Sequence, residues 1–183
     1  MVTGRLDESV RVLETALDID PLNISNIRNL GDSYYFSGYP EKAMTTYRSI
    51  LELNPEVSRV YGRMSRAALR LGNIDLAEEY AANEPVDWVR QLAEVFILAF
   101  RGDEEAWRVA ADAYAAQWGD LNSYQNAELY AVGGDIEAAF KWLETARRVR
   151  DPGTPISKVD DFLAPLHDDP RWQEHLEALG LAD

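Results

Sequence analysis

Four arginines recur at intervals that place them on one side of a single helix. They are separated by four, three and four residues, at Arg59, Arg63, Arg66 and Arg70, and this is the spacing of a helix face. A guanidinium forms bidentate, charge-assisted hydrogen bonds with a carboxylate and also stacks on aromatic rings. The pattern therefore predicts a surface that binds acidic side chains. The predicted partner-binding residues are Arg28, Tyr35, Arg59, Arg63, Arg66 and Arg70.

The same stripe has a second interpretation that the sequence leaves open. Four cations on one helix face repel one another mildly at this spacing, so an anionic neighbour is expected. That neighbour can be a partner, or it can be a local acid such as Asp32, Glu78 or Glu79. In the second case the stripe is a solvated basic face that the protein balances internally.

Residues that could support catalysis are few. His167 and His175 are the only histidines, and no third ligand stands near them at the spacing of a metal site. The acidic pairs at 160–161 and 168–169 are typical of helix caps and solvated loops. Cysteine is absent, and glycine-rich phosphate loops and nucleophile motifs are also missing. We expect a chain that is not an enzyme and needs no cofactor or metal.

Composition narrows the classes of partner and compartment. The chain has 18 basic and 32 acidic residues, a net charge of −14, which argues against nucleic acid as a partner of this segment. No run of about 20 apolar residues could span a membrane, and the first residues lack a secretory hydrophobic region. We therefore expect a cytoplasmic protein with no membrane partner.

A constant period organises the N-terminal half of the chain. Gly4, Gly38 and Gly72 are evenly spaced, and Ala43 and Ala77 are separated by the same interval. A self-similarity with a period of about 34 residues is the signature of a solenoid, in which each unit is a helix pair that buries its apolar face against its neighbours. The period therefore predicts an all-α stack of helical hairpins.

The residues at this period resemble the tetratricopeptide repeat (TPR). The best copy runs from Ile24 to Val57, with matching positions at Ile27, Leu30, Gly31, Tyr34, Gly38, Ala43, Tyr47, Ile50 and Pro55. The resemblance implies a right-handed superhelical solenoid of antiparallel helix pairs, whose inner helices line a concave groove. In this register the helix that carries the arginine stripe is an inner helix.

The repeat register divides the chain into six parts within a single TPR-like domain, residues 1–183. The expected parts are a half repeat at 1–23, the best repeat at 24–57, degenerate repeats at 58–85 and 86–121, a repeat at 122–150 and a C-terminal cap at 151–183. The inner helix of the fourth part is apolar around Phe96 and Phe100. These rings either extend the groove or pack against the adjoining helix pair.

The half repeat predicts a helix at 6–19 whose partner helix would lie before Met1. We expect either that the chain is an excerpt of a longer protein, which we favour, or that its apolar stripe is covered by another molecule. The stripe consists of Leu6, Val10, Leu13 and Leu17. It predicts homo-oligomerisation through the N-terminal half repeat.

Residues 127–181 resemble the C-terminal TPR tails of multidomain bacterial signalling proteins of the nucleotidyl cyclase or winged-helix regulator type. The resemblance rests on Tyr130, Gly134, Phe140, the Asp151-Pro152-Gly153 turn and the segment from Leu166 to Trp172. It implies a regulatory context. The predicted function is a noncatalytic module that binds a protein or peptide, acidic in character, through its concave groove. The alternative is a structural spacer or capping tail that supports an upstream enzymatic or DNA-binding domain.

Overall fold

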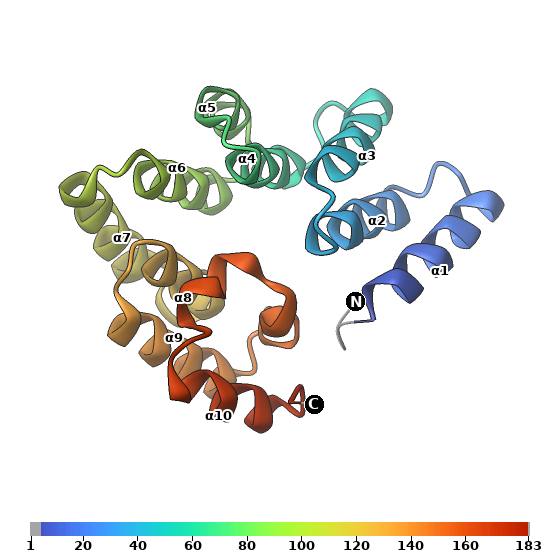
Figure 1. Ribbon diagram of the computed structural model, residues 1–183. Helices are drawn as coiled ribbons and strands as arrows, with labels where there is room; N and C mark the ends of the chain where they lie inside the picture. The colour runs from blue at the N-terminus through green and yellow to red at the C-terminus, as the bar shows by residue number, and fades with distance from the viewer. Residues whose placement is uncertain (1–4, 183) are drawn as a thin grey trace. The chain divides into compact units, whose positions relative to one another are not determined.

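The computed structural model describes residues 5–182, and within this range the chain is built from helices and turns without any strand (Figure 1). Gly4 and the rest of the half repeat before Arg5 lie outside the described residues. None of the described helices has the length and apolar content needed to cross a membrane. The chain forms two compact units, residues 5–97 and residues 98–182.

The first unit is a series of helices that pack on their neighbours along the chain (Figure 1). Helix α2 packs on α3, α4 packs on α5, and α3 also packs on α4. Helix α1 packs on α2. The helices are α1 (Leu6–Ile19), α2 (Ile24–Phe36), α3 (Pro40–Leu53), α4 (Val60–Arg70), α5 (Ile74–Ala82) and α6 (Asp87–Arg101), the last of which continues into the second unit.

The second unit combines α-helices with short 3₁₀ helices. Its elements are α7 (Glu104–Trp118), the 3₁₀ helix η1 (Gly119–Asn122), α8 (Ser123–Val132), α9 (Ile136–Val149), the 3₁₀ helices η2 (Thr154–Val159) and η3 (Asp161–Leu166), and α10 (Pro170–Leu179). Helix α8 packs on α9 and on α7, and η3 also packs on α8. The sequence predicted the turn at 151–153, but it did not predict η2 and η3.

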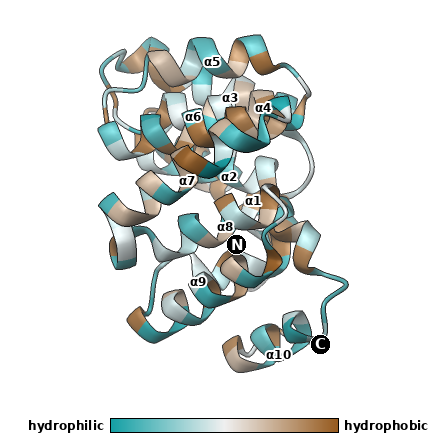
Figure 2. Cartoon of the chain, turned by 90° about the vertical axis from the view of Figure 1, so that its left-hand side faces the viewer, coloured by the Kyte–Doolittle hydropathy of each residue, from teal (hydrophilic) through white to brown (hydrophobic). Residues whose placement is uncertain are grey.

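Each helix carries both hydrophobic and hydrophilic residues (Figure 2), and its small residues lie where helices approach closely. Ala43 and Ala77 are fully buried. A side chain at Gly31 would collide with the ring of Tyr47, so the missing Cβ leaves space for that ring.

Glycine and polar caps end and begin the helices of each pair. Gly38, Gly72, Gly102 and Gly134 have φ values of 85°, 73°, 75° and 82°, in the left-handed region that a residue with a Cβ rarely adopts. After three of these glycines, an asparagine or aspartate caps the helix that follows. The side chains of Asn73, Asp103 and Asp135 each accept a backbone N–H of that helix. The predicted all-α solenoid of helix pairs is confirmed, whereas the exact repeat boundaries and the single domain stay predictions.

Helix α1 forms over the predicted residues and is only loosely covered. Ser9 Oγ lies 2.9 Å from Ser33 Oγ of α2, and the hydroxyl of Tyr34 donates to Glu14 Oε1 at 2.9 Å. No residue of α1 is buried, and its apolar stripe is half-buried. The stripe therefore faces α2 and keeps part of its surface accessible within this unit.

Candidate partner-binding surface

An ion pair between Asp32 and Arg63 joins α2 to α4 at the centre of the predicted surface. Arg63 Nε donates to Asp32 Oδ1 at 2.8 Å, and Nη2 donates to Oδ2 at 3.3 Å. The hydroxyl of Tyr47, from α3, donates to the same Oδ1 at 2.6 Å. The Arg63 side chain is 33% exposed and that of Asp32 only 15%. One carboxylate thus connects three helices of the first unit.

The charges of this group are fixed by their surroundings. Burial disfavours the charged guanidinium, but the charge of Asp32 and its hydrogen bond outweigh burial, so the pKa of Arg63 is raised. Burial, followed by the charge of Asp32 and its hydrogen bond, raises the pKa of Tyr47 well above its ordinary value. Arg63 therefore stays a cation and Tyr47 stays a neutral hydroxyl donor throughout the physiological pH range.

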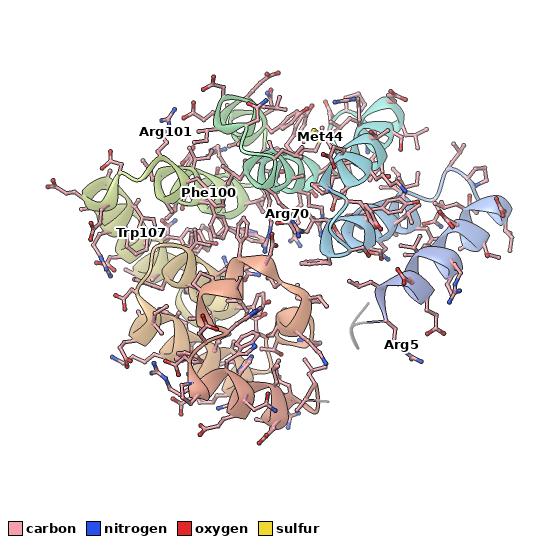
Figure 3. All side chains as sticks on the ribbon, viewed as in Figure 1. Arg5, Met44, Arg70, Phe100, Arg101 and Trp107 are labelled. Atoms are coloured by element: carbon pink, nitrogen blue, oxygen red, sulfur yellow. The ribbon has the colours of Figure 1, made fainter. Side chains whose placement is uncertain are left out.

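Arg66 and Arg70 both lie on the ring of Tyr35. Their guanidinium carbons are 5.4 Å and 5.0 Å from the ring centroid. Arg66 Nε also donates to the Tyr35 hydroxyl at 3.2 Å, and Arg70 Nη1 donates to the Tyr35 backbone oxygen at 2.6 Å. Arg70 extends from the last turn of α4 (Figure 3). Because two cations cover it, Tyr35 is only 3% exposed, and the two arginines bind α4 to α2.

These contacts follow one register along the two helices. Asp32 pairs with Arg63 and Tyr35 pairs with Arg66, and the sequence separation is the same for both pairs. The later residue of α2 contacts the later residue of α4, so the two helices run parallel. Arg28 lies one helical turn before Asp32 on the same face, and the same sequence separation leads from Arg28 to Arg59, which lies in the turn before α4. Arg28 is half-buried and makes no hydrogen bond or ion pair with the described residues.

The surface continues onto the first part of α6. The guanidinium carbon of Arg59 is 5.2 Å from the ring centroid of Trp88, and that of Arg66 is 5.9 Å from the centroid of Phe96. The sequence separations of these two pairs are nearly equal. The later arginine contacts the later residue of α6, so α6 runs parallel to α4. We call the face formed by these three helices the arginine ladder. It consists of Arg28, Asp32, Tyr35, Arg59, Arg63, Arg66, Arg70, Trp88 and Phe96.

Arg59 differs from the prediction because it lies just before α4 and not within it. It is the N-cap residue, with φ of 67°, a left-handed conformation that is unusual for a residue with a Cβ. Glu84 holds this turn: its carboxylate is 1% exposed and accepts the backbone N–H groups of Arg59 and Gly62 at 3.0 Å and of Val86 at 3.1 Å. A buried glutamate therefore replaces an ordinary side-chain cap and directs Arg59 toward Trp88.

The structure joins Tyr35 to Arg66 and Arg70 by direct contacts, and it gives the other predicted residues different surroundings. Asp32, one of the acids in the second interpretation, is the internal partner of Arg63. Phe96 is buried at 3% exposure, whereas Phe100 is 39% exposed and its ring lies 5.7 Å from that of Phe162 in the second unit. Sequence reasoning missed Glu84 and Trp88. The interval between Arg59 and Trp88 is shorter than the repeat period of about 34 residues, so the repeat register does not indicate Trp88.

The two histidines lie in the tail and make structural contacts. His175 Nε2 is 3.1 Å from Ser157 Oγ, and the ring of Trp172 stacks on both His167 and His175 at centroid distances of 4.7 Å and 5.5 Å. Burial, with a smaller effect of the charge of Arg147, lowers the pKa of His175 to about 4. Over residues 5–182, no group of three or more acidic or histidine side chains is arranged to hold a metal ion.

Comparison with known proteins agrees with the repeat register. A family model described as the tetratricopeptide repeat matches residues 29–57. The protein named Tetratricopeptide repeat protein 8 from Caenorhabditis elegans is 31% identical to this chain over 74 residues, which are 40% of this chain. The match spans only 15% of the length of that relative, so it supports a local repeat similarity.

Two solved structures share the fold over almost the whole chain. A tetratricopeptide repeat protein from Parabacteroides merdae has a TM-score of 0.62 and 18% identity, covering 98% of this chain and 73% of its own. PilW, described as a widely conserved type IV pilus biogenesis factor, has a TM-score of 0.54 and 16% identity, covering 97% of this chain and 96% of its own. The fold is therefore that of a tetratricopeptide solenoid.

The Asp32–Arg63 pair can be tested by a double-mutant cycle. Asp32→Ala or Arg63→Ala alone should lower the free energy of unfolding by about 1–3 kcal/mol, because each leaves a partly buried charge without its partner. The double variant should lose less than the sum of the two, with a coupling of about 0.5–3 kcal/mol. Urea unfolding of the four proteins measures the coupling. Strictly additive losses would contradict the pairing.

Proposed function

We propose that this protein is a noncatalytic interaction module that binds an acidic segment of a partner protein along the arginine ladder. The proposal is supported by the contacts through which the arginines at 59–70 join α2 and the aromatic rings of α6. Guanidinium groups and aromatic rings recognise carboxylates and apolar side chains together. An extended or helical peptide with acidic residues beside an apolar anchor is the complementary ligand.

The contacts divide the ladder into supporting and presenting residues. Arg63 is held by Asp32, and Arg66 and Arg70 hold Tyr35 in place, so these three build the surface. Arg28 has no hydrogen bond or ion pair with the described residues, and Arg59 is an exposed side chain. Neither guanidinium has a carboxylate partner among residues 5–182, so both are available to an acidic ligand. We therefore assign the first contact with an acidic partner to Arg28 and Arg59.

The charge of the whole chain does not prevent this interaction. The net charge of −14 repels an acidic partner at long range, but salt screens charges beyond about 10 Å at 0.1 M ionic strength. The arginines act at shorter distances, and so they dominate the bound state. Binding should weaken as salt rises above this concentration, because exposed ion pairs are screened as well.

We also propose that the module belongs to a larger regulatory protein. The tail at 127–181 resembles those of bacterial signalling proteins, and the one sequence relative described above is much longer than this chain. Both similarities support a place in a larger regulatory protein, which we locate in the cytoplasm. In such a protein the module would bring a partner to an upstream domain. A spacer that only supports that domain is the alternative, and it requires no ligand on the ladder.

A second contact is proposed at α1. Helix α3 packs on both α2 and α4, whereas the apolar stripe of α1 is only half-buried against α2. We propose that a second copy of the chain covers this stripe, because apolar surface gains free energy when it is removed from water. Sedimentation over a concentration series should show a mass that rises toward that of the dimer. A monomer at every concentration up to high micromolar would contradict this contact.

The ladder is tested by charge reversal at its presenting residues. Arg28→Glu with Arg59→Glu should weaken binding of a labelled peptide that carries two glutamates beside a leucine by at least about tenfold, or 1.4 kcal/mol. Fluorescence anisotropy measures the affinity, and circular dichroism verifies that helix content is unchanged. The matched control is Arg48→Glu on α3, an exposed arginine without a hydrogen bond or ion pair to the described residues, which should leave the affinity unchanged. Equal affinities of the parent and the ladder variant would support the spacer instead.

A further inference from the structure

A small pocket lies in the second unit between α9 and α10. None of its lining residues belongs to the arginine ladder. Its volume is about 260 Å³, below the roughly 300–1,000 Å³ of pockets that hold drug-sized ligands. Phe140 and Leu143 of α9 contribute its apolar wall. The polar wall comes from charged residues of both helices and from one histidine, namely Glu137, Lys141, Glu144 and Arg147 of α9 and Arg171, Glu174 and His175 of α10. The size indicates a ligand of few atoms.

Arg147 is the unusual residue of this pocket. Its Nε is buried from solvent and has no hydrogen-bond partner. A guanidinium cannot lose its charge under physiological conditions, and a buried donor without a partner is uncommon in native proteins. The next residue shows the ordinary outcome, because Arg148 pairs with Asp120 at 3.1 Å. Arg147 therefore has a binding capacity that the described residues do not use.

Arg171, the other arginine that lines the pocket, is already engaged. It makes two hydrogen bonds with the carboxylate of Glu137 at 3.1 Å and 2.9 Å, and it pairs with Asp169 at 2.7 Å. Its guanidinium carbon also lies 4.2 Å from the ring centroid of Phe140. These contacts fix one side of the pocket, and Glu137 is consequently not the partner of Arg147.

Two acidic residues line the same pocket without partners. Glu144 and Glu174 are exposed, and neither makes a hydrogen bond or ion pair with residues 5–182. His175, the neighbour of Glu174, is held at Ser157 Oγ and is neutral at pH 7, because burial lowers its pKa to about 4. The lining therefore offers a buried, unsatisfied donor on Arg147, a second cation at the exposed Lys141, accessible carboxylates and an apolar wall.

We propose that this pocket binds a free α-amino acid with an apolar side chain. The carboxylate of the ligand accepts hydrogen bonds from Arg147, its ammonium group binds Glu144 or Glu174, and its side chain contacts Phe140 and Leu143. A zwitterion matches a lining of both signs, whereas a simple anion would meet Glu144 and Glu174 and a simple cation would meet Lys141 and Arg147. The proposal is independent of partner binding at the arginine ladder.

The two histidines of the chain provide a direct readout. The ring of His175 lines the pocket and that of His167 does not, so NMR signals of labelled histidine separate binding from a general change. Titration with leucine should shift the His175 signal to saturation at millimolar concentration and leave the His167 signal nearly unmoved. Leucinamide lacks the carboxylate and 4-methylpentanoate lacks the ammonium group. Each should bind at least about tenfold more weakly than leucine.

Variants of the pocket complete the test. Arg147→Gln should reduce the affinity for leucine at least about tenfold, and the matched control Arg148→Gln should leave it unchanged. If Arg147→Gln does not fold, the exposed pair Glu144→Gln with Glu174→Gln tests the ammonium contact and should weaken leucine but not 4-methylpentanoate. The proposal is overturned if leucine causes no saturable shift of His175, if leucinamide binds as well as leucine, or if Arg148→Gln has the same effect as Arg147→Gln.

Discussion

The contact between Asp32 and Arg63 is the interaction on which the proposed surface depends. It fixes the register of α2 against α4, and through the hydroxyl of Tyr47 it also fixes α3. Once this register is set, Tyr35 falls beneath Arg66 and Arg70. A shift by one residue would rotate these side chains away from one another, because helix faces repeat every three to four residues. The ion pair thus determines which side chains of α2 and α4 contact one another.

The same contact explains why a basic stripe does not simply repel itself. One of its four cations is neutralised by Asp32, and two are spread over the ring of Tyr35. Only the end of the ladder near Arg28 and Arg59 gathers cations that no acid of the described residues is shown to pair with. The contacts with Asp32 and Tyr35 consequently stabilise most of the ladder, and we propose that the end near Arg28 and Arg59 recognises the acidic partner. This division between support and recognition is the physical basis of the proposed function.

Much of the fold could be predicted because it depends on local signals. Gly38 and Gly72 end helices through positive φ values, and Pro55 and Pro85 follow shortly after the second helices of their pairs. The arginine spacing likewise predicted a shared helix face. The pairing of Arg63 with Asp32 could not be selected from several nearby acids, because that choice depends on packing between helices that are distant in the sequence. Nothing local marks Glu84 as the cap before α4, or Arg147 as a buried donor without a partner.

The proposed interaction brings an acidic partner to Arg28, Arg59 and Trp88. The most direct measurement is an NMR titration that follows the arginine Nε–H signals and the tryptophan indole N–H signals as an acidic peptide is added. The signals of Arg28, Arg59 and Trp88 should shift together with one saturation curve, while that of Arg48 on α3 stays in place. Equal shifts of Arg48, or no shift at the ladder, would contradict the account.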